Sequence, residues 1–172
     1  MKKLLLATTA LLAMTMASNA AMIDIGTNPT SATGNFSFSP GSGSFEDQAV
    51  FHLTQSSTFT IANATNTFAA PPDAIVNWQA SIWSAGLDQV VNNGDDQLLF
   101  GPQSAGTCFL VPNCQQVGGS GTIVGSGTFY AEFTGIGSGT SGYSGNISTF
   151  AAPVPGPTAG SFTIASIIGL FK

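Results

Sequence analysis

The stretch IVNWQASIW, residues 75–83, alternates apolar and polar side chains along its length. The apolar side chains that fall on one face are Val76, Trp78, Ala80 and Ile82. An alternation with a period of two over four to eight residues is typical of a β-strand with one buried face. The stretch therefore predicts a strand whose inner face carries Trp78.

The same period of two recurs on both sides of this stretch, at residues 44–53, 59–61 and 129–134. Short apolar runs at 97–100 and 107–111 indicate further strands. Clusters of Gly, Ser, Asn and Pro separate these segments and are typical of turns; they occupy residues 39–43, 71–73, 92–95 and 118–121. Many short strands joined by such turns predict an all-β domain over residues 21–150, an antiparallel, jelly-roll-like β-sandwich of about seven to nine strands.

The phase of each alternation predicts which side chains face the interior. The predicted inward residues are Phe45, Phe51, Leu53, Phe59, Val76, Trp78, Ile82, Phe129 and Phe133. The chain contains 13 phenylalanines, enough apolar area to build a core, so a disordered chain is not expected.

Basic residues are rare, and this limits the classes of partner. The chain has eight acidic residues and only three basic ones, Lys2, Lys3 and Lys172. A protein that binds nucleic acid needs cations to neutralise phosphates. The composition therefore excludes nucleic acid as a partner, and it disfavours an anionic membrane surface as well.

The first twenty residues have the layout of a secretory signal peptide. Lys2 and Lys3 form a basic start, an apolar run follows over residues 4–16, and small residues at Ser18 and Ala20 precede the predicted cleavage site. The apolar run is shorter than the roughly 20 residues of a spanning helix. We therefore expect signal peptidase to remove residues 1–20, leaving Ala21 as the mature start of an exported protein.

Cys108 and Cys114 are the two cysteines of the chain, six positions apart. In an exported protein, two cysteines this close predict a disulfide. A metal site would need more ligands than two cysteines and the distant His52. We expect the disulfide and no metal cofactor.

The composition changes near residue 150. Residues 151–157 carry prolines at 153, 155 and 157, a spacing that a central strand does not tolerate. The next segment, residues 161–171, is mostly apolar but reaches only about 17 Å as a helix, against a hydrocarbon core of about 30 Å. We expect residues 151–172 to be a proline-rich linker and an apolar sorting tail that do not belong to the folded domain.

Three segments together resemble the bacterial PEP-CTERM exported proteins, in particular the subgroup named for a Phe-x-Asp-x-Phe motif. In residues 42–53, Phe45 and Asp47 match that motif, while Ala49 stands where its second Phe belongs. Residues 127–147 look like the closing hairpin of the subgroup. The sequence Val154-Pro155-Gly156-Pro157 looks like a Pro-Gly-Pro variant of the Pro-Glu-Pro sorting signal.

This resemblance implies delivery to the cell surface or the extracellular matrix (biofilm) of a Gram-negative bacterium. The resemblance also implies that an exosortase, the sorting protease of this family, acts on the tail, in addition to the signal peptidase that acts on the first segment. It implies no enzymatic activity and no cofactor.

Candidate chemical sites in the sequence are few. A catalytic triad of the Ser-His-Asp type needs a histidine as its base. His52 is the single histidine, and it falls on the outer face of a predicted strand, where an exposed histidine without a catalytic role is expected. Oxygen ligands cluster at residues 92–96, and Asp95 and Asp96 are the carboxylates of a weak calcium candidate. Trp83 and Tyr130 fall on the outer faces of their strands and can stack sugar rings if exposed.

Two hypotheses for function follow from these observations. The first is a non-catalytic structural or adhesive protein of the surface or matrix. The alternative is a carbohydrate-binding module for extracellular polysaccharide. An exposed row of aromatic rings would favour the alternative, and burial of those rings would favour the first.

Overall fold

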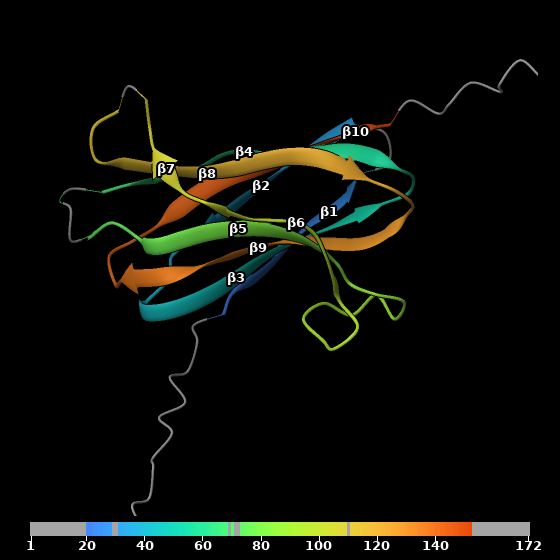
Figure 1. The fold of residues 1–172 in the computed structure, drawn as a ribbon, viewed down its shortest axis with the longest axis horizontal. Helices are drawn as coiled ribbons and strands as arrows, with labels where there is room; N and C mark the ends of the chain where they lie inside the picture. Colours follow the sequence, from blue (N-terminus) through green and yellow to red (C-terminus); the bar gives the residue numbers. More distant parts are fainter. Residues whose placement is uncertain (1–19, 29–30, 69, 71–72, 110, 153–172) are drawn as a thin grey trace, which may run out of the picture.

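The structure is a computed structural model that describes residues 20–28, 31–68, 70, 73–109 and 111–152 (Figure 1). This part of the chain forms ten β-strands and no α-helix. The strands are β1 (Met22–Asn28), β2 (Ser31–Phe38), β3 (Ser42–Leu53), β4 (Ser57–Thr67), β5 (Val76–Ser84), β6 (Gln97–Ser104), β7 (Gly106–Thr107), β8 (Cys114–Ile123), β9 (Gly127–Ser138) and β10 (Tyr143–Ala151).

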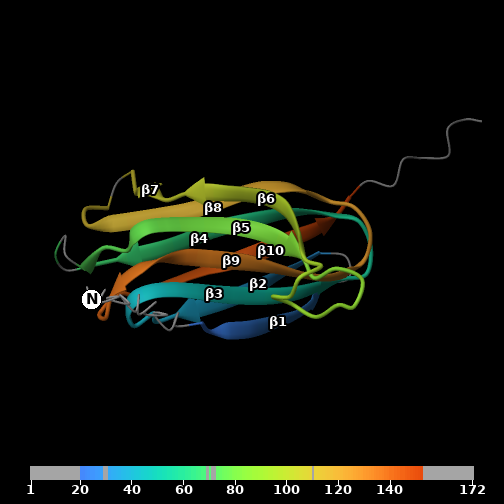
Figure 2. The ribbon, with the colours of Figure 1, turned by 60° about the horizontal axis from the view of Figure 1, so that its bottom comes forward.

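The strands make two five-stranded sheets that pack face to face (Figure 1). The first sheet has the order β1-β3-β9-β5-β6, and the second has the order β2-β10-β4-β8-β7. Figure 2 shows the first sheet from the front, with the loop between β5 and β6 at one end. The predicted all-β sandwich is confirmed, although it has ten strands and not the seven to nine predicted, and nearly every strand pair is antiparallel. β1, which lies parallel to β3, is the exception that the sequence pattern did not predict.

The core between the sheets is built largely from phenylalanine. Eight of the nine predicted inward residues are buried, and the largest fully buried side chains include Phe51, Phe59 and Phe133. Phe36 and Phe38 of β2 complete the core, with the Phe36 ring centroid 4.9 Å from that of Phe133 in the opposite sheet. Contacts of this kind between aromatic rings add to the free energy gained from apolar burial.

Val76 is the inward prediction that is wrong, since 54% of its surface is exposed. The next residue, Asn77, has a φ of 52°, and the pairing of β5 with β9 shifts register between Val76 and Gln79. A bulge of this kind reverses the alternation of faces. As a result Ile75 is buried in place of Val76, while Trp78 keeps its inward position.

The glycine cluster at residues 118–121 lies inside strand β8 and is not the turn that the sequence predicted. The glycines are needed for close approach: a Cβ on Gly118 would lie 2.5 Å from the carbonyl oxygen of Ile61. A Cβ on Gly119 would clash with the ring of Phe100. Glycine inside a strand marks this kind of close approach as well as turns. Likewise, among the described residues of the run predicted at 107–111, only Thr107 belongs to a strand.

The last described strand runs one residue past the predicted boundary at residue 150. β10 extends to Ala151, and the Ala152 amide donates a hydrogen bond of 2.9 Å to the carbonyl of Ser56. Of the predicted signal peptide, residues 1–19 lie outside the described residues, and so does the predicted sorting signal at 154–157. Nothing in the described part of the chain forms a helix of the length and hydropathy that a membrane crossing needs.

Candidate functional site

Trp83 and Tyr130 lie side by side on the outer face of the first sheet. They are paired in the β5–β9 ladder, and their rings stack with centroids 6.3 Å apart and planes 6° from parallel. The sequence placed both on the outer face, and this is where the structure has them. The two rings, however, face each other.

The loop at residues 85–96, between β5 and β6, is fastened next to these rings. The Tyr130 hydroxyl donates a hydrogen bond of 2.6 Å to Oδ2 of Asp96, and Asn92 Nδ2 donates one of 3.1 Å to Oε1 of Glu46. Only 2% of the surface of Tyr130 is exposed. Tyr130 therefore offers no free face to a sugar ring, contrary to the stacking role considered for it, and Trp83 is half-buried.

Three carboxylates surround this aromatic pair: Glu46, Glu132 and Asp96. Burial raises the pKa of Glu132, and repulsion from Glu46 and Asp96 adds to that rise, while the hydrogen bond of 3.2 Å from Trp83 Nε1 opposes it. Burial, together with the neighbouring carboxylates, also raises the pKa of Tyr130. Tyr130 therefore stays a neutral hydrogen-bond donor at every physiological pH.

At the calcium candidate, residues 92–96, carboxylate oxygens accept hydrogen bonds from backbone amides of the same loop. Oδ2 of Asp96 accepts hydrogen bonds from the amides of Asn92 and Asn93, and Oδ2 of Asp95 accepts one from the amide of Leu87. Oδ1 of Asp96 is buried without a partner. Within the described residues, no group of three or more His, Cys, Asp or Glu side chains is placed to hold a metal. Asp95 and Asp96 thus serve the loop fold, and their arrangement does not fit the cage that calcium needs.

A groove of about 540 Å³ opens at the same end of the sandwich. Its walls come from the β5–β6 loop, from β6 and from the turn between β8 and β9. Leu87 is fully exposed at its edge, and Val124 is exposed on the opposite wall. The polar lining includes Asp95 and Gln97. The groove is therefore a mixed surface of apolar and hydrogen-bonding groups.

His52 connects two strands in an order that superficially matches a catalytic triad. Its Nδ1 lies 3.0 Å from Thr128 Oγ1, and its Nε2 lies 3.4 Å from Asp24 Oδ2. Only 7% of the surface of Thr128 is exposed, whereas Asp24 is largely exposed. A nucleophile must meet its substrate, so a buried hydroxyl with a solvent-facing acid is the reverse of a working triad.

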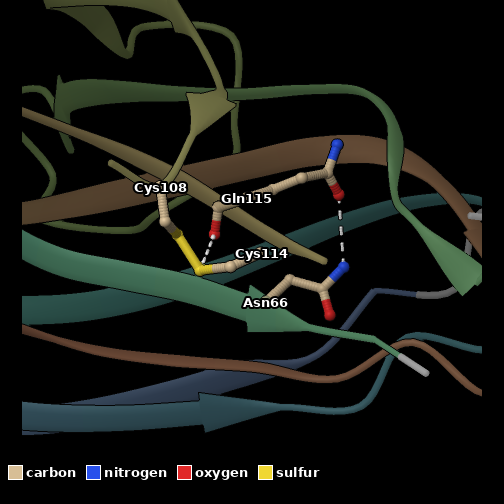
Figure 3. The surroundings of a disulfide bond; sticks show 4 residues. All are labelled: Asn66, Cys108, Cys114 and Gln115. Atoms are coloured by element: carbon tan, nitrogen blue, oxygen red, sulfur yellow. Dashed lines mark hydrogen bonds between the residues drawn. A yellow bond between two sulfur atoms is a disulfide. The ribbon is translucent and has the colours of Figure 1, made fainter. Parts of the chain in front are cut away.

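Cys108 and Cys114 form the predicted disulfide, at the edge of the second sheet (Figure 3). Next to it, the side chain of Gln115 reaches from β8 to the backbone of Ile75, accepting from its amide and donating to its carbonyl at 2.9 Å each. Gln115 Oε1 also accepts a hydrogen bond of 3.2 Å from the fully buried Asn66 (Figure 3). Gln115 thus ties the second sheet to the start of β5 in the first. The sequence analysis missed it, since a lone Gln beside a Cys carries no signal.

The two motif residues of β3 both point into the core. Phe45 and Asp47 are each 2% exposed. Oδ2 of Asp47 accepts a hydrogen bond of 2.9 Å from the Tyr143 hydroxyl, and Oδ1 accepts one of 3.0 Å from the Ala21 amide. The Asp of the motif therefore joins the closing hairpin to the predicted mature start of the chain.

Comparison with known proteins gives no family for this chain. No family model matches it, and no curated protein matches it. Among solved structures, the pre-peptidase C-terminal domain of collagenase from Bacillus anthracis is similar over 77% of this chain and 94% of that chain, with 10% identity and a TM-score of 0.33. A TM-score this low does not establish a shared topology, so the likeness carries no inference about function.

Proposed function

We propose that this protein is a non-catalytic component of the bacterial cell surface or extracellular matrix, exported through its signal peptide and sorted through its C-terminal tail. The observation that carries the proposal is the Cys108–Cys114 disulfide in a small all-β domain. Disulfides persist in oxidising compartments outside the cytoplasm. An oxidised pair of cysteines, together with the predicted signal peptide, supports export.

The reactive side chains support a structural role. Both ring nitrogens of His52 are engaged, by Thr128 and by Asp24. Asp47, Asp95 and Asp96 accept hydrogen bonds from the chain itself. The side chains on which acid–base or nucleophilic chemistry would depend hold loops and strands in place.

The end of the folded domain supports a separate role for the tail. Within the described residues, the hydrogen bonds of the domain extend as far as the bond from the Ala152 amide to the carbonyl of Ser56. The Pro-Gly-Pro sequence at 155–157 follows within three residues. On this proposal, signal peptidase acts on the start of the chain and an exosortase acts on the tail.

Removal of the tail tests the sorting role. Full-length protein and a chain ending at Ala152 are expressed in a Gram-negative host that carries an exosortase, and the cell fractions and the melting temperature of each are measured. We expect a nearly unchanged melting temperature and a different final location. A full-length chain with Pro155→Ala and Pro157→Ala is the matched control and should be missorted in the same way. Equal location of all three chains, or a melting temperature lowered by many degrees, contradicts the proposal.

The second candidate function is binding of extracellular polysaccharide, and the groove is the observation that favours it. The groove is open, and it presents the carboxylate of Asp95 and the amide of Gln97 beside exposed Leu87 and Leu99. Polar groups beside apolar surface are the usual composition of ligand sites. The test is a titration of the wild type and two variants with extracellular polysaccharide from the source bacterium. Gln97→Ala changes the groove, and Gln116→Ala on β8 is the control outside it. Binding that only Gln97→Ala weakens would support this role.

A further inference from the structure

The carboxylate of Asp47 is buried, and the described residues place no lysine or arginine beside it. Asp47 is 2% exposed, and its carboxylate accepts hydrogen bonds from the Tyr143 hydroxyl and the Ala21 amide. Lys2, Lys3 and Lys172 are the only basic residues of the chain, and none of them belongs to the described domain. Burial of an ionised carboxylate is costly unless the charge is paired and hydrogen-bonded.

Ala21 is held against β3 at both of its backbone polar atoms. Its nitrogen lies 3.0 Å from Oδ1 of Asp47, and its carbonyl accepts a hydrogen bond of 2.8 Å from the amide of Gln48. The parallel β1–β3 ladder begins one residue later, where Met22 pairs with Gln48. The nitrogen of Ala21 is therefore positioned by the sheet itself.

The same nitrogen is the one that cleavage before Ala21 would free. Hydrolysis of the Ala20–Ala21 bond consumes one water and leaves a carboxylate on Ala20 and an α-ammonium on Ala21. The α-ammonium would take the place of a neutral amide next to Asp47. The hydrogen bond from the amide to an ionised carboxylate is already charge-assisted, and an α-ammonium would add the attraction between opposite charges to it.

We propose that Asp47, with Tyr143, is the binding site for the α-ammonium of the mature N-terminus, so that removal of the signal peptide adds a partly buried ion pair at the edge of the core. This proposal rests on the proposed export, because only cleavage before Ala21 frees this amine. It gives the Asp of the β3 motif a role: the domain reaches its full stability only after processing.

The test compares chains that differ by one residue at the start. Two chains running to Lys172, one beginning at Ala21 and one at Ala20, are released from a fusion without extra residues, each with Asp47 or with Asp47→Asn. The chain from Ala20 keeps the amide at residue 21 but moves the charge away. We expect the Ala21 chain to melt about 3 °C or more above the Ala20 chain. With Asp47→Asn, that difference should vanish.

A second measurement holds even where Asp47→Asn does not fold. The α-amine of each wild-type chain is acylated over a range of pH, and its pKa is taken from the rates. Pairing with Asp47 should make the amine pKa of the Ala21 chain about one unit higher than that of the Ala20 chain. Near neutral pH, the Ala21 chain should then be labelled about tenfold more slowly. Equal melting temperatures together with equal amine pKa values would overturn the proposal. Cleavage of the exported protein at another bond would count against the export site alone, since these recombinant chains still report on the pairing.

Discussion

The hydroxyl of Tyr143 donates a hydrogen bond of 2.9 Å to Oδ2 of Asp47, and both side chains are buried between the two sheets. Asp47 belongs to β3 in the first sheet, and Tyr143 opens β10 in the second. The Tyr143 ring also packs against Trp78, with ring centroids 5.0 Å apart. This polar contact therefore links the two sheets inside a core that is rich in aromatic rings.

Loss of that hydroxyl should destabilise the domain. Tyr143→Phe keeps the ring packing but leaves one oxygen of a buried carboxylate unpaired, which costs about 1–3 kcal/mol of unfolding free energy. Urea denaturation of the oxidised protein measures the change. Tyr130→Phe is the matched control, because Asp96 keeps its hydrogen bonds from Asn92 and Asn93. Equal losses in the two variants would mean that the Tyr143 contact has no special weight.

Glu132 should lower stability at neutral pH. Because burial and Glu46 raise its pKa in the folded state, the folded protein binds this proton more tightly than the unfolded chain does. The ionised Glu132 therefore lowers the unfolding free energy by its full amount when the pH is above its pKa in the folded state. This loss disappears as the pH falls below its pKa in the unfolded chain. We expect Glu132→Gln to raise the melting temperature near pH 7 and to lose that gain toward about pH 4.

A control for this prediction removes one charge at the other end of the sandwich. Asp73 accepts a hydrogen bond from Thr140 there. Asp73→Asn should show no gain in melting temperature near pH 7. A gain from Asp73→Asn equal to that from Glu132→Gln would assign the effect to net charge instead of to the cluster.

Gln115 should be among the most sensitive polar positions of the domain. Gln115→Leu leaves the amide and carbonyl of Ile75 and the amide of Asn66 without their partner, at a cost of about 3 kcal/mol. Gln116→Leu changes the exposed neighbour on the opposite face of β8 and should cost far less. Thermal unfolding of both variants checks this. Similar melting temperatures for the two would show that the bridge between the sheets contributes little.

The disulfide should raise the unfolding free energy of the domain, by an amount that depends on the length of the loop that it closes. The bond joins residues six apart, and closing a loop of this length stabilises by about 2 kcal/mol in the chain-entropy model. A chain with Cys108→Ser and Cys114→Ser should show this loss in urea. Adding reductant should lower the stability of the wild type to the same level and leave the double variant unchanged; a reductant effect on the double variant would point to another cause.

The fold could be predicted from the sequence because period-two patterns report which face of a strand is buried. The pattern failed at Val76, where a bulge at Asn77 reversed the faces, and in β8, where glycines serve close packing. Both errors depend on contacts between distant strands, which no local pattern contains. The parallel placement of β1 beside β3 has the same origin.

The candidate site could be predicted only in part. The sequence placed Trp83 and Tyr130 on outer faces, but exposure depended on the loop that Asp96 and Asn92 fasten next to them. Asp47 could be singled out by its motif, and it has the same parity as Phe45, Phe51 and Leu53, which were predicted to face inward. Its partners come from opposite ends of the domain, and only the folded chain brings them together.

The intact mass of the protein recovered from its source cells tests export most directly. The envelope and medium are separated from the cytoplasm, and each fraction is treated with a thiol-alkylating reagent before mass spectrometry. We predict a chain that begins at Ala21 and takes up no alkyl group, because Cys108 and Cys114 are joined. A full-length chain that retains residues 1–20, lies in the cytoplasm and carries two alkyl groups would contradict the account.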